Sequence, residues 1–191
     1  MAICGIDEAG RGPWAGPVTA AAVILPRMRR PRGLADSKTL SEEARAALAL
    51  EIRACALVGV GWASAAEIDA LNIRVATHLA MRRALEALPT PPAAALVDGN
   101  DAPDLGCPVE AIVDGDAHVA CIAAASIIAK TARDAAMTAL CAQHPGYGFA
   151  QHKGYGTPQH QAALARLGPC AIHRRSFKPV RALLAAPISS P

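Results

Sequence analysis

Acidic side chains follow three short apolar segments of the chain, and this pattern is the one most suggestive of chemistry. The acids are Asp7 with Glu8, Asp98, and Asp114 with Asp116. If the apolar segments are strands of one α/β sheet, groups beyond their carboxyl ends gather at one edge of that sheet. Carboxylates that share a partly desolvated place raise one another's pKa unless a cation neutralises them. The pattern therefore predicts a cation site.

The donor types favour a hard divalent cation. Carboxylate oxygens suit Mg²⁺ or Mn²⁺, whereas zinc is usually held by His and Cys, and the six histidines show no ligand spacing. We expect these histidines on the surface or in loops, although His173 could touch a phosphate. None of the six cysteines forms a C-x-x-C pair, so reduced and mostly buried thiols are expected. Two Mg²⁺ or Mn²⁺ ions can activate water and stabilise the leaving oxygen in phosphodiester hydrolysis.

The adjacency of Asp7 and Glu8 sets a geometric condition. Neighbouring side chains on a regular strand point to opposite faces, so both reach one site only if the strand ends or bends there. Gly10 and Gly12 follow closely and permit such a bend. Asp98 alone could belong to a plain turn. The acids taken together, each at the end of an apolar segment, argue against a set of unrelated turns.

The elements that must position these acids can be predicted from apolar patterning. Five segments have the length and composition of strands: residues 1–7, 18–25, 57–63, 94–97 and 109–113. Helices are expected at residues 39–54, 64–71, 73–88, 119–142, 157–167 and 177–185, the first two opened by capping boxes at Thr39–Glu42 and Ser64–Glu67. Residues 119–142 are apolar nearly all round, which predicts the central buried helix. The order of elements indicates an α/β sheet that need not be wholly parallel.

The charge distribution is uneven along the chain. From Ala135 to the C-terminus there are six Lys or Arg residues and no Asp or Glu, whereas the remainder has a net charge of −3. A basic segment of this kind suits a polyanionic partner. Aromatic residues make up only 3% of the chain, too few for a module that binds single strands mainly by stacking. No apolar run is as long as a membrane span and no secretory leader is evident, so a cytoplasmic protein without membrane association is expected.

A series of short motifs runs through nearly the whole chain. In order they are Ile6-Asp7-Glu8-Ala9-Gly10-Arg11-Gly12-Pro13, Asp36-Ser37-Lys38, Val97-Asp98-Gly99-Asn100, Gly115-Asp116, Ala124-Ala125-Ser126-Ile127-Ile128-Ala129-Lys130, Arg133-Asp134, Tyr147-Gly148-Phe149, His152-Lys153-Gly154-Tyr155 and His173-Arg174-Arg175-Ser176-Phe177. This ordered set resembles ribonuclease HII, the bacterial type 2 ribonuclease H family. One motif could arise by chance, but the ordered set is specific.

The resemblance implies a ribonuclease H-like α/β fold, with a central mixed five-stranded sheet, flanking helices and a C-terminal helical extension. One domain over residues 1–191 is expected, with a catalytic core of about 1–143 and a basic extension of about 144–191. The implied activity is hydrolysis of RNA in RNA–DNA hybrids and incision 5′ of ribonucleotides embedded in duplex DNA, as in ribonucleotide excision repair. Products with 5′-phosphate and 3′-hydroxyl ends, a two-metal site for Mn²⁺ or Mg²⁺, and a monomer are also implied.

By motif match, the resemblance makes Asp7, Glu8, Asp98 and Asp116 the metal-binding catalytic acids. The position of Asp114 is frequently a lysine in the family, and Asp114 is the departure from its pattern. Because residues i and i+2 share a face of a strand, both acids would approach the site if the strand continued. The Gly115-Asp116 match favours Asp116 as the ligand.

The resemblance also implies substrate contacts. The Gly10-Arg11-Gly12 loop is expected to contact the ribose 2′-hydroxyl and the scissile phosphate, and Tyr155 to pack on the sugar of the following deoxynucleotide and contact the 2′-hydroxyl. Basic residues in the matched motifs are expected to contact phosphates: Lys38, Lys153 and Arg174.

Four further residues of the matched motifs are given structural roles. Lys130 could neutralise the acids, and Arg133 with Asp134 could form an ion pair. Ser126, among small neighbours, is expected to be a packing contact, because no catalytic triad is apparent.

Two other functions stay open at this point. A different metal-dependent nuclease on a related fold would explain the acids but not the Gly-Arg-Gly loop with Tyr155. A non-catalytic nucleic-acid-binding protein would explain the basic C-terminal segment. The acids argue against the second, because without a metal they would repel phosphates.

Overall fold

The five predicted strands form one mixed sheet in the computed structural model, which describes residues 2–28, 30–34 and 40–185. The strands are β1 (Ile3–Ala9), β2 (Val18–Ile24), β3 (Leu57–Ala63), β4 (Ala94–Asp98) and β5 (Val109–Ile112). Their order across the sheet is β3-β2-β1-β4-β5. The β1–β2 and β2–β3 pairs are antiparallel, whereas β1–β4 and β4–β5 are parallel. The predicted mixed sheet is therefore confirmed, and β1 lies at its centre.

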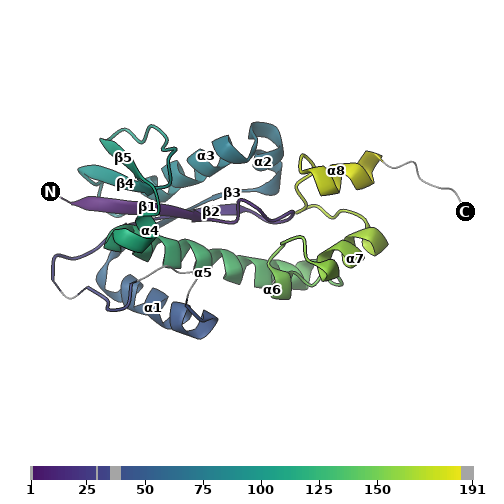
Figure 1. The fold of residues 1–191 in the computed structure, drawn as a ribbon, viewed down its shortest axis with the longest axis horizontal. Coiled ribbons are helices and arrows are strands. Elements are labelled where there is room, and N and C mark those ends of the chain that lie inside the picture. Colours follow the sequence, from purple (N-terminus) through teal and green to yellow (C-terminus); the bar gives the residue numbers. More distant parts are fainter. Residues whose placement is uncertain (1, 29, 35–39, 186–191) are drawn as a thin grey trace, which may run out of the picture.

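Helices cover both faces of the sheet (Figure 1). One face carries α1 (Glu42–Cys55) and the long α5 (Ala120–Gln143), and the other carries α2 (Ala65–Leu71) and α3 (Ile73–Glu86). Side chains of β2 alternate between the two resulting cores, since Ala20 and Ala22 pack on the α3 side and Ala21 and Val23 on the α5 side. All of β2 is buried, which explains why its sequence is a continuous apolar run.

Two glycines in β3 let α3 pack close to the sheet. A Cβ atom on Gly59 would lie 2.1 Å from the carbonyl oxygen of Ala84, and one on Gly61 would lie 2.1 Å from that of Ala80. Neither distance is possible for a real side chain, so glycine is required at both positions. Glycines usually weaken a strand, but here they follow from the approach of the helix.

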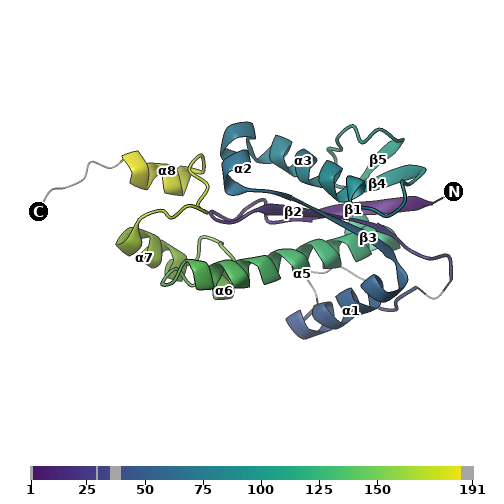
Figure 2. The same ribbon diagram turned by 180° about the vertical axis from the view of Figure 1, so that it is seen from behind.

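The end of α5 carries the C-terminal part of the chain (Figures 1 and 2). This part comprises α6 (Phe149–His152), α7 (Pro158–Leu167) and α8 (Lys178–Ala185). A third hydrophobic cluster lies beneath it and includes Ala15, Met137, Tyr147 and Val180. The C-terminal segment is thus packed against the loop after β1 as well as against α5. Among the described residues, none of the helices is both long and apolar enough to cross a membrane.

Several details differ from the sequence-based predictions. Ser41 caps α1 by accepting the backbone N–H of Ala44, whereas Thr39 lies outside the described residues. The expected capping box at Ser64 is present. The cysteines are all free, but Cys4 is the buried one and Cys55 is exposed, so the prediction of mostly buried thiols was wrong.

The segment after β5 is also different. The strand ends at Ile112, and Asp114 adopts a left-handed conformation with φ of 54° before the short helix α4 (Gly115–His118) begins. Asp114 and Asp116 therefore do not share a strand face. Asp114 is exposed, whereas Asp116 is buried.

Candidate active site

A groove of about 360 Å³ lies where β1 and β4 end, and three of the predicted acids line it: Asp7, Glu8 and Asp98. The Gly10–Gly12 loop, Ser126 and Tyr155 also line the groove. Asp116 is not among its lining residues, but its backbone N–H donates to Oδ1 of Asp98 over 3.2 Å. The structure therefore brings the carboxylates of two distant segments, and the backbone of a third, to one edge of the sheet.

Asp7 and Glu8 reach the same groove although β1 continues past both of them. The expectation that the strand would end at Asp7 was wrong, because β1 runs to Ala9 and pairs with β2 to its end. On the other side of β1, the pairing with β4 stops at Ile6 and Val97. Beyond that pair one edge of β1 is open, so residues on both of its faces can border a common space.

The two side chains keep the usual strand alternation. Asp7 lies on the α5 side, where the Ser126 hydroxyl hydrogen-bonds to its carboxylate. Glu8 lies on the α3 side, where it borders a second small hollow with Thr77 and His78 of that helix. Ser126 was expected only to pack closely, and its hydroxyl contact with Asp7 could not be read from the small residues around it.

The acids destabilise one another's charged forms. Burial raises the pKa of Asp7 well above its usual range, and the charges of Glu8 and Asp98 raise it further. Burial also raises the pKa of Glu8, although Arg11, 3.3 Å away, opposes that rise. These are hard oxygen donors that lack sufficient positive charge, which is the environment a divalent cation would relieve.

The carboxylate oxygens are chemically suited to a divalent cation, but the side chains do not converge on one position. Over residues 2–28, 30–34 and 40–185, no three His, Cys, Asp or Glu side chains are already arranged to hold a metal ion. Carboxylates that repel one another are expected to stand apart until a cation draws them together. The groove is therefore a candidate metal site by its donors and its electrostatics.

The loop after β1 is held in place by Arg174. Its guanidinium donates to the carbonyl oxygens of Gly10 (2.6 Å), Arg11 (2.9 Å) and Gly16 (3.0 Å). The side chain is fully buried, so the prediction that Arg174 contacts phosphate was wrong. Burial, together with the nearby Arg133, lowers the pKa of Arg174 to about 9. Arg174 instead shapes the loop that borders the groove.

A second buried guanidinium, that of Arg133 on α5, supports the same loop. It donates to the carbonyl oxygens of Ala15 (3.3 Å), Pro17 (3.0 Å) and Lys153 (3.0 Å). Gly10 has φ of +94°, and a Cβ atom there would lie 1.9 Å from Nε of Arg133. The Gly-Arg-Gly loop thus needs glycine at its first position both for its backbone conformation and for the space that Arg133 occupies.

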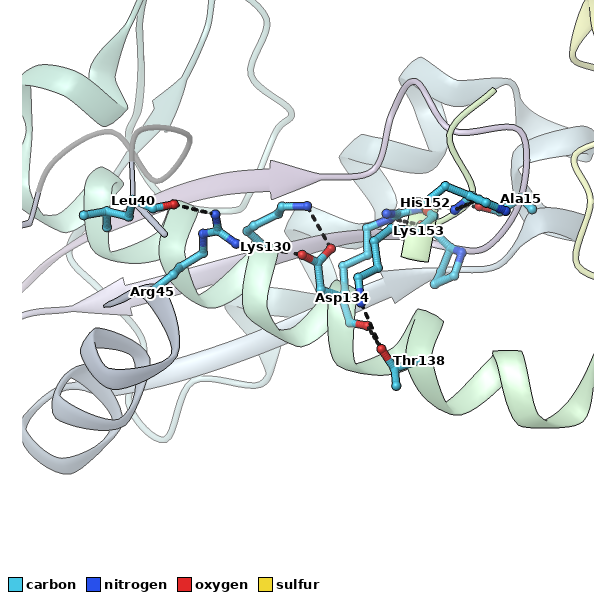
Figure 3. A network of polar contacts seen from close by, with 11 residues as sticks. Ala15, Leu40, Arg45, Lys130, Asp134, Thr138, His152 and Lys153 are labelled. Atoms are coloured by element: carbon cyan, nitrogen blue, oxygen red, sulfur yellow. Dashed lines mark hydrogen bonds and ion pairs between the residues drawn. The ribbon is translucent and has the colours of Figure 1, made fainter. Parts of the chain in front are cut away.

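The predicted ion pair between Arg133 and Asp134 was wrong. Figure 3 shows Lys130 and Arg45 converging on Asp134 instead, at 2.8 and 3.9 Å. Lys130 also lines the groove. Arg133 instead donates to the backbone carbonyls of Ala15, Pro17 and Lys153.

Two residues predicted to contact substrate are exposed or partly exposed. Tyr155 is 44% exposed in the groove, with Cζ of Arg133 5.9 Å from its ring centroid. Lys153 is half-buried, and its Nζ donates to Oγ1 of Thr138 over 3.0 Å (Figure 3). Lys153 does not line the groove. Lys38 lies outside the described residues.

Three histidines are buried, with exposed fractions of 8% for His152, 0% for His160 and 1% for His173. The prediction of surface or loop positions was wrong for His152 in α6 and His160 in α7, whereas His173 lies in the loop between α7 and α8. His173 cannot reach a phosphate because its ring is enclosed. No local pattern marks these residues as internal, since His152 and His160 have polar or basic neighbours on both sides and two arginines follow His173.

Known proteins resemble this chain over nearly its whole length. The family model described as Ribonuclease HII matches residues 4–180. A "Ribonuclease HII" of Jannaschia sp. (strain CCS1) is 57% identical over 183 residues, which span 95% of this chain and 92% of the relative. The crystal structure of ribonuclease H2 from Pyrococcus horikoshii OT3 has a TM-score of 0.80 and 25% identity, with 96% of this chain and 97% of that chain covered.

A third structure resembles the chain in fold alone. It is the crystal structure of Bst-RNase HIII in complex with Mn²⁺, with a TM-score of 0.76 and 20% identity. The match covers 97% of this chain and 70% of that one.

Proposed function

The chain belongs to the ribonuclease HII family and is a ribonuclease H, and from this premise we propose that Asp7, Glu8, Asp98 and Asp116 are its metal-binding catalytic acids. The observation that carries this proposal is the shared groove, because carboxylates from the ends of β1 and β4 line it together with the Gly10–Gly12 loop. Asp116 joins the set through the hydrogen bond from its backbone to Asp98.

The cofactor we propose is a pair of Mn²⁺ or Mg²⁺ ions. The family is metal-dependent, and the raised pKa of Asp7 and Glu8 supports a need for added positive charge here. When bound, such ions supply an activated water and a charge partner for the leaving oxygen of a phosphodiester. The protein's own contribution is to orient the acids: the Ser126 hydroxyl holds Asp7, and Arg11 holds Glu8.

The Gly10–Gly12 loop and Tyr155 are proposed to recognise the ribonucleotide. Gly12 and Arg11 are exposed and line the groove beside the acids, so the loop offers one cation and backbone that no side chain covers at Gly12. Tyr155 presents its ring on the same groove and is exposed enough to meet a sugar. The substrate we propose is an RNA–DNA hybrid or a DNA duplex with an embedded ribonucleotide, which differs from DNA by its 2′-hydroxyl.

The remaining basic residues are proposed to position the duplex through its phosphates. Lys153 is partly exposed close to Tyr155 in sequence, and Lys38 joins it on the strength of its motif alone. Arg174 is excluded from this role because it is buried. Contacts of this kind fix the register of the duplex without reading its sequence.

The reaction we propose is incision 5′ of the ribonucleotide, which leaves 5′-phosphate and 3′-hydroxyl ends. We further propose that a single domain over residues 1–191 carries it, with the basic extension after about residue 143 folded onto the catalytic core. The cluster of Ala15 and Met137 with Tyr147 and Val180 supports this arrangement. A monomer acting in the cytoplasm is part of the same proposal.

A labelled DNA duplex with one internal ribonucleotide tests the function directly. The protein is incubated with this duplex and with the matching all-DNA duplex, with and without Mn²⁺. We expect one cut, 5′ of the ribonucleotide, only when Mn²⁺ is present, and no cut in the all-DNA duplex. Asp7→Asn is the matched negative control, because it removes a charge with little change of shape.

The other outcomes identify the alternatives. Cleavage of both duplexes would show a general metal-dependent nuclease and would refute ribonucleotide recognition. Binding to the duplex without cleavage, at every Mn²⁺ concentration, would refute a catalytic role for the acids.

A further inference from the structure

Three buried imidazole rings lie beneath the part of the chain that carries Tyr155. The rings of His152 and His160 stack with centroids 4.5 Å apart, and those of His160 and His173 are 5.3 Å apart. His160 belongs to α7, and His173 to the segment that pairs with Ala15 in the loop after β1. None of these side chains lines the groove of the acids, so the function proposed above leaves them without a role.

The hydrogen bonds of His173 and His160 fix the proton positions on both rings. The backbone N–H of Cys170 donates to Nδ1 of His173 over 2.9 Å, so this nitrogen is an acceptor and the ring proton is on Nε2. Nε2 of His173 lies 3.0 Å from Nε2 of His160, which must then accept. The proton of His160 is therefore on Nδ1, which donates to the carbonyl oxygen of Tyr155 over 2.9 Å.

The chain of bonds ends on the backbone of Tyr155. That carbonyl oxygen also accepts the N–H of Thr157 over 2.8 Å, and the N–H of Tyr155 donates to the carbonyl of His152 over 2.9 Å. Both polar groups of the Tyr155 backbone are thus bonded, whereas its side chain is in the groove and 44% exposed. A fixed backbone beneath an exposed ring is what a recognition residue requires, because little freedom is then lost on binding.

We infer that His160, oriented by His173, is a positioning residue that holds the Tyr155 ring in place for the ribonucleotide. The inference rests on the proposed role of Tyr155 in substrate recognition. His160 does not touch the reacting atoms in this account. It acts through the Tyr155 carbonyl, and His173 acts through His160.

Both rings are held neutral by their surroundings. A second proton on His173 would face the Cys170 N–H, and one on His160 would face the Nε2 proton of His173. Burial lowers the pKa of His160, and burial with the neighbouring His160 lowers that of His173 to about 4. The titratable groups facing the pair are these: His144, His152, Tyr147 and Cys170. At neutral pH the pair is therefore a fixed donor–acceptor chain and not a proton source.

Two substitutions separate the two ends of His160. His160→Asn places an amide N–H near the position of Nδ1 and keeps a donor for Tyr155, whereas His160→Gln reaches toward His173 and loses that donor. We expect His160→Asn to retain cleavage at a single ribonucleotide within about threefold, and His160→Gln to lose about tenfold, as for one hydrogen bond. Asn leaves more space in the core than Gln, so the thermal stabilities should rank in the opposite order.

The decisive measurement is a double-mutant cycle with Tyr155→Ala on the full chain. If His160 acts through Tyr155, His160→Gln should cause no further loss of kcat/KM once the ring is absent. The same tenfold loss in both backgrounds would overturn the inference, and so would activities that simply follow the melting temperatures. If Tyr155→Ala alone leaves cleavage unchanged, the proposed role of Tyr155 fails. That result differs from the one that overturns the role of His160, in which Tyr155→Ala impairs cleavage and His160→Gln causes the same loss with and without the ring.

A spectroscopic readout keeps the inference testable if the His160 variants do not fold. In the unmodified protein labelled with ¹⁵N-histidine, the ring signals of His160 and His173 should report neutral rings of opposite tautomers from pH 8 to pH 6. Identical tautomers, or a charged ring in this range, would overturn the inference.

Discussion

Asp98 accepts the backbone N–H of Asp116, so the carboxylate at the end of β4 caps the short helix that carries another of the proposed acids. The residue at the usual capping position, Asp114, makes no side-chain bond to that helix. The bond at 3.2 Å links two acids that are 18 residues apart in sequence. It gives Asp116 a defined place beside the groove although the strand before it has already ended.

This relationship separates Asp114 from Asp116 in function. Asp116→Asn should reduce cleavage by at least the roughly hundredfold that loss of a metal's supporting contact can cause, because it removes charge at a buried position beside Asp98. Asp114→Asn should stay within about twofold, because that side chain is exposed. Steady-state cleavage of the single-ribonucleotide duplex in Mn²⁺ checks both. The opposite ranking would transfer the proposed ligand role to Asp114.

The raised pKa of Asp7 and Glu8 predicts how pH and metal affect stability. Between the ordinary pKa and the raised one, the folded protein binds more protons than the unfolded chain. The contribution of these two groups to the free energy of unfolding of the metal-free protein should therefore be fully present below their ordinary pKa and be lost as pH rises through the raised pKa of each group. Asp7→Asn removes one buried charge and should raise the melting temperature of the metal-free protein at pH 8.

Thermal melts with and without Mn²⁺ check this prediction. Mn²⁺ should raise the melting temperature of the unmodified protein more at pH 8 than at pH 5, since bound metal needs deprotonated ligands. A gain of about 1 kcal/mol corresponds to about 3 °C for a chain of this size. Asp114→Asn serves as the control and should leave the Mn²⁺ shift intact. An equal shift in Asp7→Asn would contradict a metal role for Asp7.

Gly10 provides a test of the loop that borders the groove. Gly10→Ala would place a Cβ atom 1.9 Å from Nε of Arg133, whereas Gly106→Ala meets nothing within 4 Å. Both positions have positive φ, +94° and +73°, so both variants bear a backbone strain of about 1 kcal/mol. Only Gly10→Ala must also displace a buried guanidinium.

We expect Gly10→Ala to lose most of its cleavage activity, and Gly106→Ala to keep it with a small decrease in melting temperature. Both are measured side by side with the single-ribonucleotide duplex. Equal activity of the two variants would show that the conformation of the Gly-Arg-Gly loop does not matter for cleavage.

Much of the fold follows from local patterns in the sequence. The predicted bounds of the strand at residues 57–63 agree with β3, and Thr157 with Pro158 begins α7 as expected. The acids of β1 and β4 could be predicted to share an edge, since each follows an apolar segment. These features depend on the spacing of apolar residues, on helix caps and on prolines, all of which can be recognised from residues close together in the sequence.

The features that could not be predicted depend on contacts between distant segments. Arg174 and Arg175 are identical neighbours, yet Arg174 is fully buried and Arg175 is exposed. The difference is set by the carbonyls of Gly10 and Arg11, more than 160 residues away, toward which one guanidinium turns. The burial of the histidines could not be predicted for the same reason, because their partners are backbone groups and rings that only the fold brings together.

Arg174 therefore allows a final prediction with a matched neighbour as control. Arg174→Lys keeps the positive charge but cannot reproduce the fork that bonds the carbonyls of Gly10, Arg11 and Gly16. Losing these bonds in the interior should lower the free energy of unfolding by about 3 kcal/mol. It should also release the Gly-Arg-Gly loop, so that cleavage falls even at temperatures where the variant is folded.

Arg175→Lys is the control, because it makes the same chemical change at an exposed neighbouring position. Arg175 is exposed and bonds to Asp69 through its backbone N–H, which the substitution leaves in place. Melting temperature and cleavage of the single-ribonucleotide duplex should both stay near those of the unmodified protein. If Arg175→Lys impairs cleavage as strongly as Arg174→Lys, both residues act through the substrate phosphates, and the loop-shaping role of Arg174 is wrong. A loss confined to Arg174→Lys, with binding to an all-DNA duplex unchanged, is the result that the buried geometry predicts.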